Sequence, residues 1–134
     1  MAEPRTRPTT ADPAALLAAL APAQRRSDAE AIADLLGQIS GCPPVLWGTS
    51  IIGFGQYPAA TGPWPRLGYS PRKANHVLYL MDGFDGQADL LGALGKATTG
   101  VSCLYVKRLA DIDRHVLAEI VRRSWAMMAV RYPD

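Results

Sequence analysis

Two runs decide the fold of this chain: LWGTSIIGFGQYP (Leu46–Pro58) and GPWPRLGYSPRKANHVLY (Gly62–Tyr79). Together they hold two of the three tryptophans and three of the five tyrosines. Their glycines alternate with large apolar residues, a pattern typical of short strands joined by tight turns. We expect this stretch to form most of a sheet, with helices from the rest of the chain packed on it.

Length and composition favour a single globular domain. A chain of 134 residues buries roughly two thirds of its unfolded surface on folding, which is enough for one core. The net charge of +2 is too small to favour a nucleic-acid partner. Cys42 and Cys103 lack the paired spacing of a structural zinc site and the density of a secreted disulfide scaffold. We therefore expect two reduced, buried thiols.

The N-terminal segment predicts where the domain begins and where the protein resides. Residues 1–11 contain prolines, threonines and arginines and almost nothing to bury. We expect a disordered tail there, followed by one domain over residues 12–134. No hydrophobic segment of signal-peptide type follows the N-terminal charges, and no apolar run approaches the roughly 20 residues of a membrane helix. A cytoplasmic protein with no membrane partner is the expectation.

Two helices are expected before the first strand. Asp12–Pro13 is typical of an N-cap with proline at the first helical position, and Ala14–Ala21 predicts a short helix that ends before Pro22. Ser27–Glu30 fits a capping box for a second helix, although nothing bars an earlier start near Pro22. The apolar stripe of this second helix comprises Ile32, Leu35, Leu36 and Ile39. The acids that we expect to face solvent are Asp28, Glu30 and Asp34.

The remaining pattern places strands next to strands. The expected strands are Val45–Phe54, Arg66–Tyr69, His76–Met81, Lys96–Thr99 and Val101–Val106. A helix over Asp85–Leu94 interrupts them, and a last helix opens at Asp111–Asp113 and runs to about Val130. Strands that follow one another directly favour antiparallel pairing. The prediction is an α+β domain, with an antiparallel sheet of about five strands in the order α-β-β-β-α-β-β-α and a short extra N-terminal helix.

Several blocks of sequence carry a resemblance to a known family. The blocks are WGTSIIGFG (Trp47–Gly55), GYSPRK (Gly68–Lys73), LYL (Leu78–Leu80), LGK (Leu94–Lys96) and CLYVKRLADID (Cys103–Asp113). Their combination resembles the YdhG-like family, a domain of unknown function, over about residues 16–125. The resemblance implies a small bacterial α+β domain in the cytosol. It supplies no catalytic residues to transfer, and whether a cofactor is bound stays unknown. One branch of that family is similar to a frataxin-like intracellular iron chaperone.

Cationic and aromatic residues supply the first candidate site. Arg72 and Lys73 follow a proline in a turn, where two cations beside backbone amides are suited to a phosphate or carboxylate. Lys107, at the end of the last strand, is expected near the same edge. The candidate walls of a cleft are Tyr57, Trp64 and Tyr69. The alternative is a solvated turn with surface ion pairs. The first hypothesis is a non-enzymatic binding module for a small anion or for the acidic segment of a partner protein.

Metal binding is the second hypothesis. Asp82, Asp85 and Asp89 lie within eight residues, and the last two stand one helical turn apart. Carboxylate oxygens of this kind are what an iron chaperone needs. The alternative is an acidic helix start that serves capping and solvation. The other acids are spread thinly along the chain, so metal binding ranks below the first hypothesis.

An enzyme is the third and least favoured hypothesis. Nothing in the sequence places an acid, a base and a nucleophile together, and neither histidine has a second ligand at a metal-binding spacing. The last helix carries more apolar residues near its end than one buried face needs, namely Trp125, Met127 and Met128. This surplus predicts a homodimer.

Overall fold

The computed structural model describes residues 8–60, 62–81, 83–84 and 86–132. The helices are α1 (Pro13–Ala18), α2 (Ala23–Ser40), α3 (Ala88–Leu94) and α4 (Arg114–Arg131), with a short 3₁₀ helix η1 (Leu109–Asp111). The strands are β1 (Pro44–Trp47), β2 (Ile51–Phe54), β3 (Tyr57–Ala59), β4 (Gly62–Trp64), β5 (Leu67–Pro71), β6 (His76–Leu80), β7 (Thr98–Thr99) and β8 (Cys103–Val106). The predicted α+β class is confirmed.

The main sheet is antiparallel at every described pairing. Its strand order is β1-β2-β5-β6-β8-β7, and β3 pairs only with β4. The main sheet has six strands where about five were expected. The extra strand arises because the segment Val45–Phe54, predicted as one strand, forms the two paired strands β1 and β2. Gly48 adopts a φ of 63°, a left-handed conformation that glycine accepts without strain. The chain then returns with Trp47 opposite Ile51.

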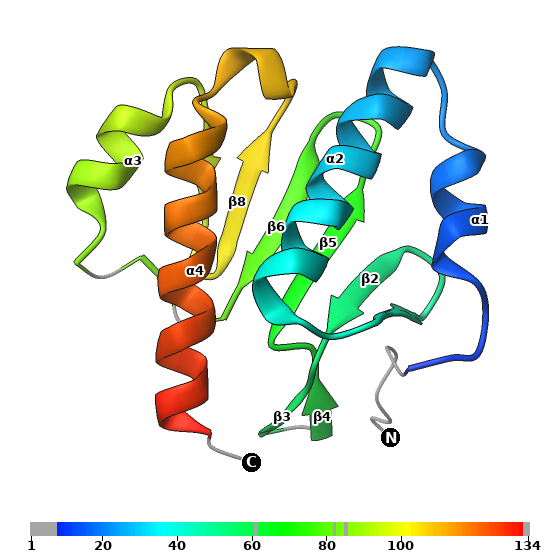
Figure 1. The fold of residues 1–134 in the computed structure, drawn as a ribbon, viewed down its shortest axis with the longest axis horizontal. Helices are drawn as coiled ribbons and strands as arrows, with labels where there is room; N and C mark the ends of the chain where they lie inside the picture. Colours follow the sequence, from blue (N-terminus) through cyan, green and yellow to red (C-terminus); the bar gives the residue numbers. More distant parts are fainter. Residues whose placement is uncertain (1–7, 61, 82, 85, 133–134) are drawn as a thin grey trace.

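The long helices cover one face of this sheet. Figure 1 shows α2 and α4 side by side in front of the strands, with α1 and α3 at the two flanks. Strand side chains alternate between the two faces, so every second residue of each strand meets these helices. The fully buried core positions include Ile32, Leu36, Ile52, Phe54, Leu67, Leu78, Leu80, Leu104, Leu117 and Ile120.

Helix α2 differs from its prediction in two ways. It begins at Ala23, with Pro22 at the N-cap, so the capping box at Ser27–Glu30 is wrong and the alternative start near Pro22 is confirmed. Asp28 was expected to face solvent, but only 2% of it is exposed. The reason is helical geometry: Asp28 lies one turn before Ile32 and two turns before Leu36, on the stripe that faces the sheet.

Other helix ends follow the sequence signals. Asp12 accepts a hydrogen bond from Ala14 N at 3.0 Å, and Asp113 accepts from His115 N at 2.8 Å, as N-caps do. Gly95 follows the last residue of α3, as expected. Helix α3 begins at Ala88, with Gln87 at its N-cap, so the predicted start at Asp85 is wrong by three residues; Asp85 itself lies outside the described residues.

The two cysteines are free and half-buried, so the expectation of fully buried thiols is wrong, whereas the absence of a disulfide between them is confirmed. Cys103 lies on β8 with its side chain on the face that the helices leave uncovered, which explains its partial exposure. No helix among the residues described is long and apolar enough to cross a membrane.

Candidate functional site

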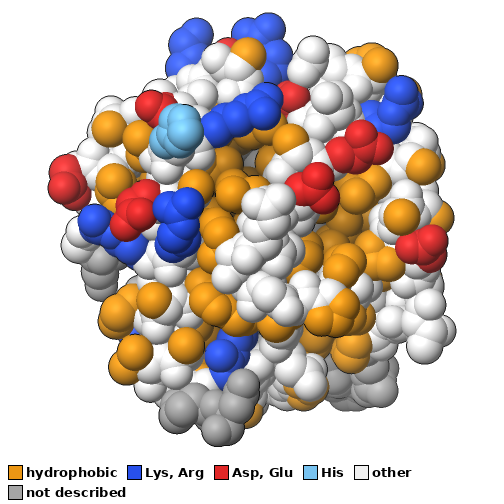
Figure 2. Space-filling model, viewed as in Figure 1, with side chains coloured by type: hydrophobic (Ala, Val, Ile, Leu, Met, Phe, Trp, Pro, Cys, Tyr) orange, Lys and Arg blue, Asp and Glu red, His pale blue; other side chains and the backbone are white. Residues whose placement is uncertain are grey.

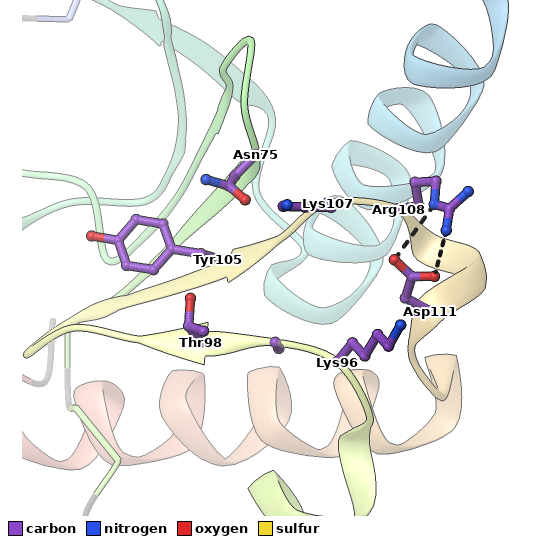
Figure 3. A pocket seen from close by; sticks show the side chains of 8 residues that line it. Asn75, Lys96, Thr98, Tyr105, Lys107, Arg108 and Asp111 are labelled. Atoms are coloured by element: carbon purple, nitrogen blue, oxygen red, sulfur yellow. Dashed lines mark hydrogen bonds and ion pairs between the residues drawn. The ribbon is translucent and has the colours of Figure 1, made fainter.

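The uncovered face of the sheet carries a hollow at its β6-β8-β7 end. Its volume is about 700 Å³, within the range of small-molecule sites. Figure 3 views this hollow with the strands in front and the long helices behind them. The residues that line it are Asn75, Lys96, Ala97, Thr98, Tyr105, Lys107, Arg108 and Asp111.

Strand pairing brings these residues together from separate parts of the chain. Thr98 stands opposite Tyr105 in the β7–β8 hairpin, and the chain before β7 is tied to η1 because Lys96 N donates to Asp111 O at 3.1 Å. Asn75 comes from the turn between β5 and β6, and His76 beside it pairs with Val106 of β8. The hollow therefore lies where three neighbouring segments end.

The electrostatics of the hollow favour an anion. Arg108 and Asp111 form an ion pair with 3.2 Å between Nη2 and Oδ1. Lys96 and Lys107 are exposed, and neither forms an ion pair with any acid among the residues described. Three cations and one carboxylate leave a surplus of two positive charges. Two ammonium groups beside hydroxyl and amide donors are suited to phosphate or carboxylate oxygens.

Tyr105 adds a neutral donor to this site. Its pKa is raised above the ordinary value of 10.0, first by a hydrogen bond with the Cys103 side chain and also by the nearby Tyr79, while Arg72 opposes the shift. The phenol is therefore protonated at neutral pH and does not repel an anion.

The predicted cations Arg72 and Lys73 lie beside the hollow and do not line it. The Arg72 guanidinium donates to Tyr79 Oη at 2.8 Å and to Ser70 Oγ at 3.2 Å. Its backbone N–H closes the turn by donating to Asn75 O at 2.9 Å. Lys73 is exposed on that turn. Of the three predicted cations, Lys107 alone is a lining residue.

The three predicted aromatic residues lie in three different places. Trp64 is half-buried on the uncovered face, with its ring 6.2 Å from that of Trp47. Tyr57 packs on Tyr132 near the C-terminal end, with 4.9 Å between ring centroids. Tyr69 is fully buried under the helices. These three side chains do not form one cleft.

Tyr69 belongs to a buried polar cluster on the covered face. Its Oη lies 2.5 Å from His76 Nδ1, and His76 Nε2 lies 3.9 Å from Asp28 Oδ2. The Asp28 carboxylate accepts from Gln24 Nε2 at 2.8 Å and from Leu109 N at 3.1 Å. The cluster thus ties α2, β5, β6 and η1 together.

Burial favours the neutral forms of the histidine and the tyrosine in this cluster. Burial lowers the pKa of His76 from its ordinary value, with Asp28 opposing the shift. Burial also raises the pKa of Tyr69 above its ordinary value. A neutral phenol donating to His76 Nδ1 leaves the imidazole proton on Nε2, toward Asp28. Asp28, Tyr69 and His76 are each at most 2% exposed, so the cluster is closed to solvent and its contacts join elements of the fold.

Only one of the three predicted metal ligands belongs to the described residues. Asp82 and Asp85 lie outside the described residues, and Asp89 is exposed on α3. In the described part of the chain, no group of three or more histidine, cysteine, aspartate and glutamate side chains is placed to hold a metal ion.

The end of α4 presents less apolar surface than the sequence suggested. Met128 is buried, and Trp125 is half-buried beneath the Arg66 guanidinium, which lies 5.8 Å from the ring centroid. Met127 is 45% exposed and Val130 76% exposed. The homodimer stays a prediction.

The helix-covered side of the molecule offers a weaker candidate. Figure 2 shows acidic and basic side chains mixed on this side, with apolar side chains between them. Two hollows of about 300 and 490 Å³ involve residues of α2. Their linings are mainly apolar, and the smaller one sets Asp34 against Arg114. Neither has the surplus of positive charge of the hollow at Lys96 and Lys107.

Sequence reasoning missed Lys96, Asn75, Thr98 and Tyr105 as site residues. A signal for Lys96 was present in the predicted hairpin around Gly100. Extending the register of Thr98 and Tyr105 by two residues away from the turn brings Lys96 level with Lys107. The expected strand pair thus indicated only that Lys96 lies near the end of the last strand, whereas the register that sets it level with Lys107 comes from the structure.

Comparisons with known proteins add no relative: no family model matches this chain, and neither a curated protein nor a solved structure matches it.

Proposed function

We propose that this protein is a binding module for a small organic anion, a phosphate ester or a carboxylate, which it holds in the hollow between Lys96 and Lys107. The observation that carries the proposal is the presence of two lysines without acidic partners among the described residues, in one hollow of about 700 Å³. The chain has only three lysines, and two of them meet here.

The neighbouring groups support an anion rather than a cation. Asn75, Thr98 and Tyr105 bring amide and hydroxyl groups to the same hollow, and such donors bind oxyanions alongside ammonium groups. Asp111 is held by Arg108, so its charge is already neutralised. The resemblance to the YdhG-like family, as an uncharacterised cytosolic domain, is compatible with this proposal because that family brings no assigned reaction.

The test is a thermal-unfolding screen against inorganic phosphate, phosphorylated sugars, nucleotides and carboxylates, followed by calorimetric titration of each compound that stabilises the protein. A ligand at a hundredfold excess over its Kd stabilises the folded state by about 2.7 kcal/mol. Because the site is exposed, we expect the affinity to fall as salt is added.

Single lysine variants locate the site. Lys96→Ala and Lys107→Ala each remove one charge from the hollow, and we expect each to weaken anion binding. Lys73→Ala is the matched control, since Lys73 is also exposed and lies outside the lining. Equal weakening by all three variants would indicate diffuse attraction without a site. A screen in which no anion stabilises the wild-type protein would refute the proposal.

A further inference from the structure

A row of aromatic side chains crosses the uncovered face of the sheet and ends at the hollow. Trp64 lies between Trp47 and Tyr79, with centroid distances of 6.2 and 6.5 Å. The ring planes of Trp64 and Tyr79 are perpendicular, at 89°. Tyr79 of β6 stands opposite Cys103 of β8, which makes Tyr105 its diagonal neighbour on the same face, within reach of an aromatic side chain.

Glycines in the central strands make room for this row. A Cβ on Gly53 would lie 2.5 Å from Trp47 Nε1 and 2.8 Å from Pro65 Cβ. A Cβ on Gly68 would lie 3.2 Å from Tyr79 Cδ2. At Gly53 these distances leave no space for a side chain, and at Gly68 a Cβ would press tightly on Tyr79, so the rings lie close to the backbone of β2 and β5. The alternation of glycine with large residues in the sequence thus lets a row of tilted aromatic rings lie close to the sheet.

Tyr105 is the member of the row that also lines the hollow. Figure 3 shows its ring nearly face-on from the open side of the sheet, beside Thr98 and on the same side as Lys107. Arg72 donates to Tyr79 Oη at 2.8 Å, and its positive charge opposes the rise in the pKa of Tyr105. A planar cation therefore borders the aromatic row close to the site.

We infer that the anion bound in the hollow is a nucleoside phosphate, whose base stacks on Tyr105 while its phosphate lies between Lys96 and Lys107. The inference rests on the proposed function and adds the class of ligand. The charge surplus and the ring face belong to one continuous surface, and a hollow of about 700 Å³ accommodates a molecule of this size. Stacking on a tyrosine tolerates any base, because every base has a π-face.

The experiment compares adenosine monophosphate, ribose 5-phosphate and inorganic phosphate by calorimetric titration of the full chain. We expect adenosine monophosphate to bind roughly five- to hundredfold more tightly than ribose 5-phosphate, the range of one base–aromatic stack. Tyr105→Leu removes the hydroxyl donor as well as the ring, so it should lower the affinity for ribose 5-phosphate only as far as loss of the hydroxyl does, and it should abolish that difference. Tyr105→Phe keeps the ring and should restore it. Tyr57→Leu is the control for loss of a tyrosine elsewhere.

The possible results separate this inference from the proposed function. If ribose 5-phosphate binds as tightly as adenosine monophosphate, the nucleoside class is wrong and anion binding stands. If none of the three compounds binds, the nucleoside class is wrong, and the proposed function falls as well only when the carboxylates and the other anions of the screen also fail to stabilise the protein. A short single-stranded oligonucleotide could bind far more tightly than the mononucleotide, with Trp64→Leu weakening the binding of the oligonucleotide alone. In that case the aromatic row binds a nucleic-acid polymer, and the inference is overturned.

Discussion

The two faces of the sheet place their charged side chains in opposite environments, one buried and hydrogen-bonded and the other exposed. On the covered face, the Asp28 carboxylate accepts hydrogen bonds from Gln24 and Leu109 and lies near His76. On the uncovered face, Lys96 and Lys107 have no acidic partner within the described part of the chain. A buried charge without partners costs several kcal/mol, on the order of the stability of a small domain, whereas an exposed ammonium group stays hydrated. The acid is therefore enclosed by its hydrogen-bond partners on one face, and the two ammonium groups remain available to a ligand on the other.

The two regions are nevertheless adjacent along the chain. The Asp28 carboxylate accepts a hydrogen bond from the backbone N–H of Leu109, and Leu109 directly follows Arg108 of the hollow. His76 directly follows Asn75, another lining residue. The hydrogen bonds of the buried polar cluster thus fix the backbone beside the residues that line the hollow.

The largest expected effect on stability comes from removing the buried acid of the covered face. Asp28→Ala leaves the buried Leu109 N–H and the Gln24 amide without their acceptor. We expect the free energy of unfolding to fall by about 2–4 kcal/mol, measured by urea denaturation. Glu30→Ala, at an exposed position on the same helix, is the control, with a change within about 0.5 kcal/mol. Similar losses in the two variants would mean that the buried acid contributes nothing.

A smaller effect is expected from crowding the uncovered face. Gly53→Ala places a Cβ against Trp47 and Pro65, at 2.5 and 2.8 Å, and overpacking of this kind costs about 1–3 kcal/mol. Gly92→Ala on α3 meets nothing within 4 Å and should stabilise the protein by about 0.5–1 kcal/mol, because alanine favours a helix. Denaturation midpoints of the two variants should therefore move in opposite directions. A neutral Gly53→Ala would show that the aromatic row does not lie close to the backbone.

The smallest expected effect is a pH dependence of the free energy of unfolding, which arises from His76 on the covered face. Burial lowers the pKa of His76, and Arg25 adds to that effect while Asp28 opposes it. The unfolded chain therefore binds more protons than the folded protein, so this contribution to stability is complete above about pH 6.5 and is lost as the pH falls from there toward the lowered pKa.

His76→Gln removes that contribution and should flatten the dependence of unfolding free energy on pH over about pH 5–8. Urea denaturation at several pH values measures the slope. His115→Gln, at an exposed position on α4, controls for the loss of an imidazole. The prediction fails if wild type and His76→Gln share one slope.

Local signals explain what the sequence predicted well. Asp12 and Asp113 are caps because their side chains lie next to the N–H groups they satisfy, and such neighbours are visible in the sequence. The α+β class followed from strands that succeed one another without helices. The burial of Asp28 was missed because the capping-box pattern drew the helix start to Ser27, although the spacing of Asp28, Ile32 and Leu36 placed the acid on the core stripe.

The hollow was harder to predict because it depends on pairing across the chain. Asn75 reaches Lys107 only through the pairing of β6 with β8, and Lys96 only through the pairing of β7 with β8. Tyr69 was expected at the rim of a cleft, whereas strand alternation and the position of the helices decide that it points inward. The face that each strand residue takes depends on where α2 and α4 pack, which no single strand pattern contains.

The anion site in the hollow is tested most directly by titrating isotope-labelled protein with ribose 5-phosphate and monitoring the amide NMR shifts. We expect the largest changes at Lys96–Thr98 and Tyr105–Asp111, with small changes at the outer end of the sheet around Leu46. We also expect that Lys96→Ala/Lys107→Ala keeps the wild-type spectrum elsewhere and loses the response, because anion binding depends on the two lysines. Shifts centred on another surface, or an undiminished response in the double variant, would contradict an anion site in the hollow.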